Sequence, residues 1–472
     1  MSFVAALGDR FRSSADHVMM VTADGRRYTY AEIHDRAAAF ADHAAGCGVR
    51  PGDAIAVEMS NGVDMLVWYF ACFFGGYVMV PVNPELSPED RAHIRRVVAP
   101  TLSVGEDTVV DASPRAGRPM PPSWPDDRPG VIFFTSGTTD RPKGVMHSWA
   151  TLIGNVTAFN RRCDIRSDAR MLHVLPMAYM AGFLNTVLSP VVAGGTVVVG
   201  QRFGPRSMLD FWSLPSRERV NDVWLTPSIA VALLRSSRDD AIARAALADF
   251  KHVFCGTAPL HDALRSDFLT RFGRPLQESY GTSEQLLLSA QSPEDALVRR
   301  DVGSVLDTAD LDFVESEPGI REIVVGSRHL GYLTAEGIVP PVTDAHGRTG
   351  TGDAGRLVDG RLEITGRLKD LIIRGGINVS PVAVENALAD IDGVCDVAVV
   401  GLPHAFWGEI IVACLEVAPG TDEQAVVAMA MNRARERLAK AFQPDRVVAM
   451  PAFPRATTGK IQKRLLREGL AG

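Results

Sequence analysis

The segment FFTSGTTDRPKGVMHS, from Phe133 to Ser148, joins an apolar run to a cluster of small and hydroxyl residues and a lysine. Small residues let several backbone N–H groups turn toward one point, and the hydroxyls add further donors. The lysine supplies a mobile ammonium group. This composition predicts a loop that holds phosphate oxygens, formed by Thr135, Ser136, Gly137, Thr138, Thr139 and Lys143.

The phosphate loop is not of the Walker A type. Pro142 stands where that motif has glycine, and no Gly-Lys-Ser/Thr triplet follows at the required spacing. A surface turn rich in Ser, Thr and Gly would have the same composition, so the residues alone leave both interpretations open.

A second glycine pattern, G-x-G-x-x-G from Gly350 to Gly355, matches a dinucleotide fingerprint literally. No apolar strand precedes it and no helix pattern follows it, as that fingerprint requires. The next stretch, RLVDGRLEITG, instead predicts two short strands around Asp359-Gly360. We therefore reject a dinucleotide site here.

The phosphate loop resembles that of the adenylate-forming superfamily, which includes acyl-CoA synthetases, aryl-acid ligases and adenylation domains. The family pattern is Ser-Gly-Thr-Thr-Gly-x-Pro-Lys-Gly, and only Asp140 departs from it, by replacing a glycine. A carboxylate there would weaken ATP binding or alter the mobility of the loop. Further motifs are similar and come in the family order down nearly the whole chain, namely CGTAPL, ESYGTSE, RTGTGDAGRLVDGRLEITGRLKD and PRATTGKIQKRLLRE.

The resemblance implies a role for each matching residue. Lys460 is the catalytic lysine, Ser283 contacts the α-phosphate, and Glu284 holds Mg²⁺, a hard cation that normally binds few carboxylates plus phosphates. Lys369 takes the hinge position. The implied adenine and ribose residues are Gly256, Thr257, Ala258, Pro259, Tyr280, Gly281, Asp353 and Arg367.

The implied reaction has two halves. The acid attacks the α-phosphorus of Mg-ATP to give an acyl-adenylate and pyrophosphate, with Lys460 lowering the repulsion between two anions. The C-terminal domain then rotates, and Gly375-Gly376 lets a pantetheine arm pass so that the CoA thiol takes the acyl group. Open alternatives are a carrier-protein thiol, an amine, an atypical diazotising reaction, or a non-catalytic adenylate-binding protein.

The segment LPMAYMAGF is similar to the acyl-pocket segment of the family, with Ala178-Tyr179 in place of the usual Phe-His pair. No aspartate is present there to bind the ammonium group of an α-amino acid. We expect aromatic walls with a few hydroxyls, and hence a small or aromatic carboxylic acid rather than a long fatty acid. The predicted pocket residues are Tyr179, Met180, Gly182, Phe183, Thr226, Ser228 and Thr257.

Composition excludes several other classes. A net charge of -7 over 472 residues, without a long basic block, argues against nucleic acid. The six cysteines never form C-x-x-C, which argues against a metal knuckle or a disulfide framework and favours the cytoplasm. The apolar run from Met65 to Val82 is divided by Gly75-Gly76, so we interpret it as a buried helix, capped at Asn61, and a buried strand rather than a membrane span. We expect a monomer or a homodimer.

Apolar β-type runs alternate with helical stretches, such as MLDFWSLPSRERV and IAVALLRSSRDDAIARAALADF, which predicts an α/β fold with mainly parallel sheets. Short strands and turns from about Leu311 predict a smaller antiparallel sheet or barrel. The resemblance implies a large N-terminal AMP-binding domain, residues 1–367, with two mainly parallel sheets and a distorted β-barrel. A small mobile α+β domain, residues 368–472, follows it with a strand-helix-strand-helix pattern.

Overall fold

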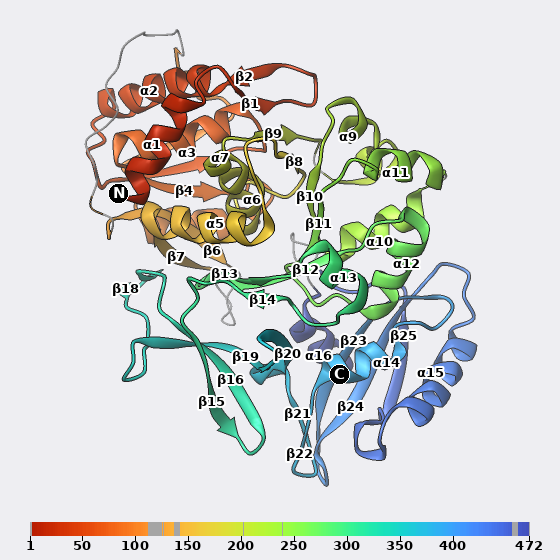
Figure 1. Cartoon of the computed structure of the whole chain (residues 1–472). Helices are drawn as coiled ribbons and strands as arrows, with labels where there is room; N and C mark the ends of the chain where they lie inside the picture. Colours follow the sequence, from red (N-terminus) through yellow and green to blue (C-terminus); the bar gives the residue numbers. More distant parts are fainter. Residues whose placement is uncertain are drawn as a thin grey trace.

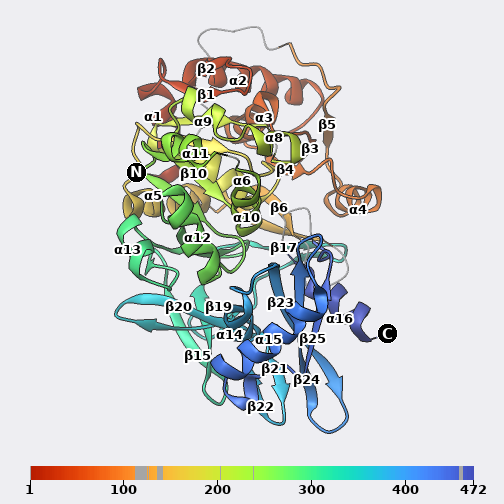
Figure 2. The same ribbon diagram turned by 90° about the vertical axis from the view of Figure 1, so that its right-hand side faces the viewer.

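The computed structural model describes residues 2–111, 125, 127–135, 142–201, 203–237, 239–455 and 461–471. Figures 1 and 2 show a larger N-terminal part above a smaller C-terminal part, which ends in the blue segment of the chain. Alternating helices and strands fill the larger part. The predicted α/β class is therefore confirmed.

The larger part contains a long mixed sheet, with thirteen strands among the described residues. Strands β1, β9, β8, β10, β11 and β12 are parallel neighbours, and the strands beyond β12 pair antiparallel. In spatial order the strands are β15 (Leu311–Glu317), β16 (Ile320–Gly326), β19 (Arg348–Val358), β20 (Arg361–Arg367), β14 (Ser304–Val305), β13 (Leu286–Ala290), β12 (Gln277–Thr282), β11 (His252–Cys255), β10 (Asp222–Leu225), β8 (Arg170–His173), β9 (Thr196–Val199), β1 (Val18–Val21) and β2 (Arg27–Thr29).

A second sheet has seven strands within the described ranges. Its strands β5, β3, β4 and β6 are parallel, whereas β7, β17 and β18 extend it antiparallel. In spatial order they are β18 (Gly337–Val339), β17 (Gly331–Thr334), β7 (Lys143–Ser148), β6 (Pro129–Thr135), β4 (Val78–Val82), β3 (Ala54–Glu58) and β5 (Leu102–Gly105).

The predicted distorted barrel is wrong as a closed structure. The short strands that begin at Leu311 do form, but they continue the long sheet, in which β15 and β2 are the two free ends within the described residues. Antiparallel pairing through β13 and β14 joins the two halves of this sheet, so the strands curl without closing.

Helices cover both sheets and lie between them. Local signals set their ends: Thr29 and Glu32 form a capping box at the start of α2, and Gly76 ends α3 in the left-handed conformation that glycine adopts freely. The helices of the N-terminal part are α1 (Phe3–Ser13), α2 (Tyr30–Gly46), α3 (Val63–Gly75), α4 (Pro88–Val98), α5 (Trp149–Cys163), α6 (Met180–Phe183), the π-helical turn η1 (Leu184–Leu188), α7 (Ser189–Ala193), α8 (Pro205–Leu209), α9 (Ser213–Arg217), α10 (Pro227–Ser236), α11 (Asp240–Leu247), α12 (Asp262–Phe272) and α13 (Pro293–Val298).

The apolar run from Met65 to Val82 forms the predicted buried helix α3 and buried strand β4. The cap prediction is wrong, because Gly62 is the N-cap of α3. The Asn61 side chain instead donates to Leu175 O at 2.7 Å and accepts from Met177 N at 2.7 Å. No helix in the described part of the chain is long and apolar enough to cross a bilayer.

Two predicted helical stretches are each divided. MLDFWSLPSRERV covers parts of α8 and α9, and IAVALLRSSRDDAIARAALADF covers α10 and α11. Ser237, the C-cap of α10, has extended backbone, and the Asp239 side chain caps α11, so polar residues between the helices redirect the chain. The apolar periodicity continues across this interruption, which is why the sequence suggested single helices.

The C-terminal part has its own sheet of five strands among the described residues and its own core. Helices α14 and α15 pack on one face, and α16 packs on the other. The predicted strand-helix-strand-helix order is only approximate, because strands occur in pairs. The elements are the 3₁₀ turn η2 (Leu368–Asp370), β21 (Ile372–Arg374), β22 (Ile377–Val379), α14 (Pro381–Leu388), β23 (Val394–His404), β24 (Gly408–Val417), α15 (Glu423–Arg437), the 3₁₀ turn η3 (Lys440–Phe442), β25 (Arg446–Met450) and α16 (Lys463–Ala471).

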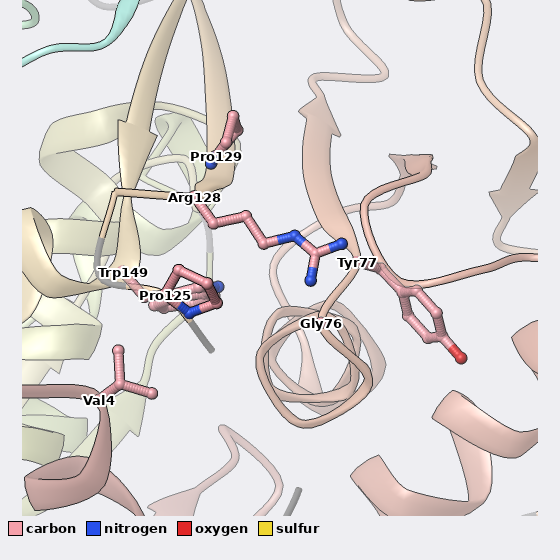
Figure 3. A pocket seen from close by; sticks show the side chains of 7 residues that line it. All are labelled: Val4, Gly76, Tyr77, Pro125, Arg128, Pro129 and Trp149. Carbon is pink, nitrogen blue, oxygen red and sulfur yellow. The ribbon is translucent and has the colours of Figure 1, made fainter. Parts of the chain in front are cut away.

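A small cavity of about 10 Å³ lies near the end of α3, and Figure 3 shows the Arg128 side chain reaching toward the Gly76-Tyr77 turn beside it. That volume holds about one water molecule. Val4, Pro125, Pro129 and Trp149 complete the lining, and no predicted site residue belongs to it. The cavity is therefore a packing feature of the N-terminal part.

Asp222, at the start of β10, supplies a test of the fold. Its side chain is 1% exposed and its Oδ1 has no hydrogen-bond partner, so burial raises the pKa of this carboxyl to about 7. In the unfolded chain the group ionises near its ordinary pKa of 3.8. Folding therefore holds a proton that the unfolded chain releases, and stability falls as pH rises from about 4 to 7.

We expect Asp222→Asn to raise the Tm relative to the unchanged protein at pH 8, by an amount equivalent to at most about 4 kcal/mol, and much less at pH 5. Thermal unfolding at the two pH values measures this difference. An equal difference at both pH values would show that Asp222 ionises normally in the folded protein.

Candidate active site

The predicted phosphate loop connects two paired strands. Thr135, the last residue of β6, lies opposite Lys143, the first residue of β7. The backbone pairing thus brings both ends of the loop together at one sheet edge. Ser136, Gly137, Thr138, Thr139 and Asp140 lie outside the described residues.

Lys143 lies above an aromatic ring that the sequence did not single out. Its Nζ is 4.4 Å from the centroid of the Tyr332 ring, a cation–π contact. The Tyr332 hydroxyl donates to Glu284 Oε1 at 3.2 Å. Burial, and then the Glu284 charge, raises the pKa of Tyr332. One tyrosine therefore joins the predicted phosphate lysine to the predicted metal ligand.

Two histidines lie beside this tyrosine. Strand β17 pairs with β7, and Leu330 N donates to Met146 O at 2.8 Å, which holds the preceding residue His329 against β7. The His147 Nε2 bonds the Ser283 carbonyl oxygen at 2.7 Å. Burial lowers the pKa of His147 to about 4, and burial is also the main cause of a lowered pKa at His329. Both rings are therefore neutral at pH 7.

The predicted ribose carboxylate, Asp353, is 8% exposed. It accepts from the Tyr280 hydroxyl at 2.9 Å through Oδ2 and from Arg367 Nε at 2.9 Å through Oδ1. Strand pairing places Asp353 directly opposite Arg367 on β19 and β20. Burial, and then the Asp353 charge, raises the pKa of Tyr280, so the phenol stays protonated and donates. The structure thus brings three predicted nucleotide residues into contact.

The predicted adenine turn follows β11. Gly256 is buried, and a Cβ atom there would come within 3.2 Å of Ser279 Oγ. Thr257 is exposed and has φ of 74°, a left-handed conformation that is strained for a β-branched residue. Ala258 is partly buried, and Pro259 is exposed.

A buried ion pair secures that turn to β12. Glu278 accepts from Leu260 N at 3.3 Å through Oε1 and from Arg265 of α12 through Oε2. Arg265 is 5% exposed and Glu278 is 8% exposed, so removal of either partner would leave a buried charge uncompensated. The pair fixes the Gly256–Leu260 turn relative to the strand that carries Tyr280.

The predicted acyl segment is tightly packed. Asn83 Nδ2 donates to the Tyr179 hydroxyl at 3.1 Å, and Met180 begins the short helix α6. A Cβ atom on Gly182 would lie 2.0 Å from Pro176 O, so only glycine fits there. Phe183 is fully buried and stacks on Tyr69 with 3.7 Å between ring centroids. The structure therefore places Phe183 in the core rather than on an open wall.

The other predicted pocket hydroxyls lie at the start of α10. Thr226 caps this helix by accepting from Ile229 N at 3.2 Å, and its hydroxyl is 2.9 Å from that of Ser228. A groove of about 490 Å³ borders Ala178 and follows the carboxyl ends of β3, β4, β8 and β9. Carboxyl ends of parallel strands are where open α/β sheets bind ligands.

The catalytic lysine predicted from the resemblance, Lys460, lies outside the described residues. On either side of it, Arg455 and Ile461 form a β-bridge, and Arg455 bonds Asp396 and Glu416 at 2.8 Å each. These ion pairs anchor the chain where it enters the segment that carries the lysine.

The predicted hinge residue lies beside the predicted ribose residues Asp353 and Arg367, whereas the predicted thiol residues lie away from them. Lys369 is exposed in the turn η2, directly after β20. Gly375 and Gly376, both with positive φ, form the turn between β21 and β22, at the end of the C-terminal part that both figures place far from the N-terminal part. A Cβ atom on Gly375 would lie 2.9 Å from the Trp407 ring.

Several residues of the site escaped the sequence analysis. Tyr332 and His329 lie on a strand and loop far in sequence from Glu284, and Arg265 lies on an ordinary helical stretch. Glu278 is the first residue of the motif ESYGTSE, but the spacing of that motif does not predict its hydrogen bond to Leu260 N. The only signal was the Gly331-Tyr332 pair after a β-type run, which is too common to be informative.

Comparison with protein families gives two matches. The model described as "AMP-binding enzyme" matches residues 8–326, and the model "AMP-binding enzyme C-terminal domain" matches residues 383–460. The two matches leave residues 327–382 between them, so the domain boundary at residues 367 and 368 stays a prediction.

Full-length relatives agree with the family matches. The chain is 32% identical to a long-chain-fatty-acid–CoA ligase, FadD13, of Mycobacterium tuberculosis, over 94% of this chain and 93% of that protein. It is 31% identical to a feruloyl-CoA synthase of an Amycolatopsis species, over 96% of each chain. Among solved structures, ATP-bound MatB from Rhodopseudomonas palustris superposes with a TM-score of 0.85 at 25% identity, covering 100% of this chain and 99% of that one.

These matches span both parts of the fold and follow the order of the motifs. Lys143, Tyr280 and Glu284 lie within the first matched segment, whereas Asp353 and Arg367 lie between the two. The chain belongs to the AMP-binding enzyme family, and it is an adenylate-forming, acyl-CoA synthetase-like ligase.

Proposed function

We propose that this enzyme uses ATP to convert a small or aromatic carboxylic acid to an acyl-adenylate, releases pyrophosphate, and transfers the acyl group to the thiol of CoA. The observation that carries the proposal is the buried Asp353 carboxylate between Tyr280 and Arg367. Each carboxylate oxygen has a second lone pair, and a charged acceptor bonds vicinal hydroxyls strongly, so a ribose fits there. The names of the relatives support CoA as the acceptor.

The positions of the other residues suggest how ATP would lie. Tyr280 offers its ring to adenine from β12, and Ser283 and Glu284 follow a few residues along the chain. Lys143 lies on the neighbouring sheet, where Tyr332 links it to Glu284. We therefore propose that ATP lies with its base at Tyr280 and its distal phosphates at Lys143, and that the bond to be broken lies near Ser283.

The Glu284 site is suitable for Mg²⁺. Tyr332 bonds only one of its carboxylate oxygens in the described structure. No group of three His, Cys, Asp or Glu side chains in the described ranges is placed to hold a metal, which suits an ion bound by one carboxylate together with phosphates. When bound, Mg²⁺ would offset phosphate charge. Glu284 would position it, and Tyr332 would orient Glu284.

The thioester step requires a different arrangement of the C-terminal part. The Gly375-Gly376 turn is distant from the proposed nucleotide residues, whereas α16 lies near the junction of the two parts. Contacts across this junction include polar ones between described residues, such as His261 to Asn386 at 2.8 Å and Asn378 to Glu317 at 2.7 Å. Such contacts break at small cost, so rotation about Lys369 is feasible.

The packed acyl segment supports a small or aromatic acid. Phe183 fills the core beside Tyr69, and Gly182 leaves no room for a side chain. The Tyr179 hydroxyl accepts a hydrogen bond from Asn83. Extending the pocket for a long chain would require these residues to move together. The two relatives differ on this point, because one is named for long-chain fatty acids and the other for an aromatic acid.

We expect Lys460→Ala to reduce acid-dependent ATP–pyrophosphate exchange by a factor of at least about 100, because a cation that screens two approaching anions is lost. The variant should still acylate CoA from adenylate supplied ready-made. Exchange measured with labelled pyrophosphate, together with thioester formation from synthetic adenylate, tests both halves. Unimpaired exchange would remove Lys460 from the proposed role.

We expect Asp353→Asn to raise the KM for ATP by roughly 10- to 100-fold, since hydrogen bonds to a charged acceptor contribute about 1.5–3 kcal/mol. The KM for the acid should change little. Glu363→Gln is the matched control, because Glu363 pairs with Arg356 on the same two strands but is partly exposed. Equal effects of both substitutions would refute a ribose role for Asp353.

A panel of acids tests the pocket. We expect acids the size of benzoate to give a kcat/KM at least about tenfold above that of a long-chain acid in the same exchange assay. One or two methylene groups of the substrate that do not fit the pocket are enough to produce such a ratio. CoA, a carrier protein and amines offered to the adenylate would identify the acceptor. A preference for the long-chain acid would contradict the small-pocket proposal.

A further inference from the structure

His329 has no assigned role, and its surroundings are unusual for a packing residue. It lies in the loop between β16 and β17 and is 5% exposed. Its ring meets the Tyr332 ring edge-on, with 4.9 Å between centroids. Tyr332 in turn contacts Lys143 on one side and Glu284 on the other. The imidazole is therefore held beside one cation and one anion of the proposed phosphate site.

Neither ring nitrogen of His329 has a hydrogen-bond partner among the described residues, although both are shielded from solvent. The Nδ1 of the fully buried His147, on β7, likewise has no partner in the described ranges, but it is an acceptor, because Nε2 of this neutral ring donates to Ser283 O. Leaving buried polar atoms unpaired is unfavourable, and an apolar side chain would fill the same space without that cost. A cluster of such atoms next to Lys143 and Glu284 points to a ligand that pairs with them.

The chemistry of the cluster defines that ligand. The Lys143 ammonium group and the single N–H donor of the neutral His329 imidazole suit an anion with several oxygens, whereas Glu284 suits the cation that accompanies it. The cluster lies at the Lys143 end, away from Asp353 and the proposed ribose position. A diphosphate group carries several anionic oxygens, which a lysine and an imidazole N–H can bind together. The proposed reaction forms such a group from the distal phosphates of ATP.

We propose that His329 binds the departing diphosphate, by donating a ring N–H to one of its oxygens, and so positions it for both release and the reverse reaction. The proposal rests on the proposed function, since it names a residue for the diphosphate of that reaction. His329 thereby gains a partner that the described residues do not provide.

Three variants test the role of His329. His329→Met keeps the volume but removes both nitrogens, and His329→Gln keeps an N–H donor. His173→Met is the matched control, because His173 is fully buried with an unpartnered Nε2 but lies on β8 and bonds Thr186. Each is titrated with inorganic pyrophosphate in the presence of Mg²⁺ by calorimetry, and its Tm is measured without ligand.

We expect His329→Met to weaken pyrophosphate binding about tenfold, equivalent to about 1.4 kcal/mol. Its KM for pyrophosphate in the exchange reaction should rise similarly, with an unchanged KM for the acid. Its ligand-free Tm should be equal or higher, because two unpaired polar atoms are removed. His329→Gln should bind within about threefold of the unchanged protein, and His173→Met should bind equally well.

If His329→Met folds and binds pyrophosphate as tightly as the unchanged protein, the role of His329 is overturned and the proposed function stays intact. If His329→Met does not fold, His329→Leu replaces it in the same test. Equal weakening in His173→Met would also overturn it, since the effect would then be one of packing. An unchanged protein that neither binds pyrophosphate nor exchanges it with any acid would instead refute the proposed function.

Discussion

The Asp353 carboxylate is the interaction on which the arrangement of the nucleotide residues depends. It joins three strands, because Tyr280 comes from β12, Asp353 from β19 and Arg367 from β20. A buried anion is stable only when donors surround it. Tyr280 and Arg367 satisfy that need without using every lone pair. The same contacts that stabilise the strand junction therefore leave acceptor capacity for a ligand.

A second constraint comes from the meeting of the two large sheets. Lys143 and Tyr332 belong to the seven-stranded sheet, whereas Glu284 follows β12 of the longer one. The Tyr332 hydroxyl bonds Glu284 across this junction. The lysine proposed for the phosphates, and the residues proposed for the metal and the ribose, are thus carried by different sheets. Packing of the shared core between the sheets sets the distance between them.

Much of the fold could be predicted from local patterns. The buried strands, the helix α3 with the strand β4, and the hairpin at Asp359-Gly360 all form as the sequence indicates, because apolar periodicity and glycine conformation act over a few residues. The closed barrel, the cap at Asn61 and the single helices over α8–α9 and α10–α11 were wrong. The sheet arrangement and the cap depend on contacts with distant segments, such as the bonds of Asn61 to Leu175 and Met177, whereas the break between α10 and α11 follows from the local caps Ser237 and Asp239.

By itself the sequence determined which residue types are available for nucleotide chemistry and their order along the chain, from Thr135 and Lys143 through Tyr280 and Glu284 to Asp353. Only the tertiary structure decided which of them touch. Tyr332 and His329 joined the site because β17 pairs with β7, and Phe183 left the predicted pocket wall because it stacks on Tyr69. Strand pairing and core packing act between residues far apart in sequence, so no local pattern records them.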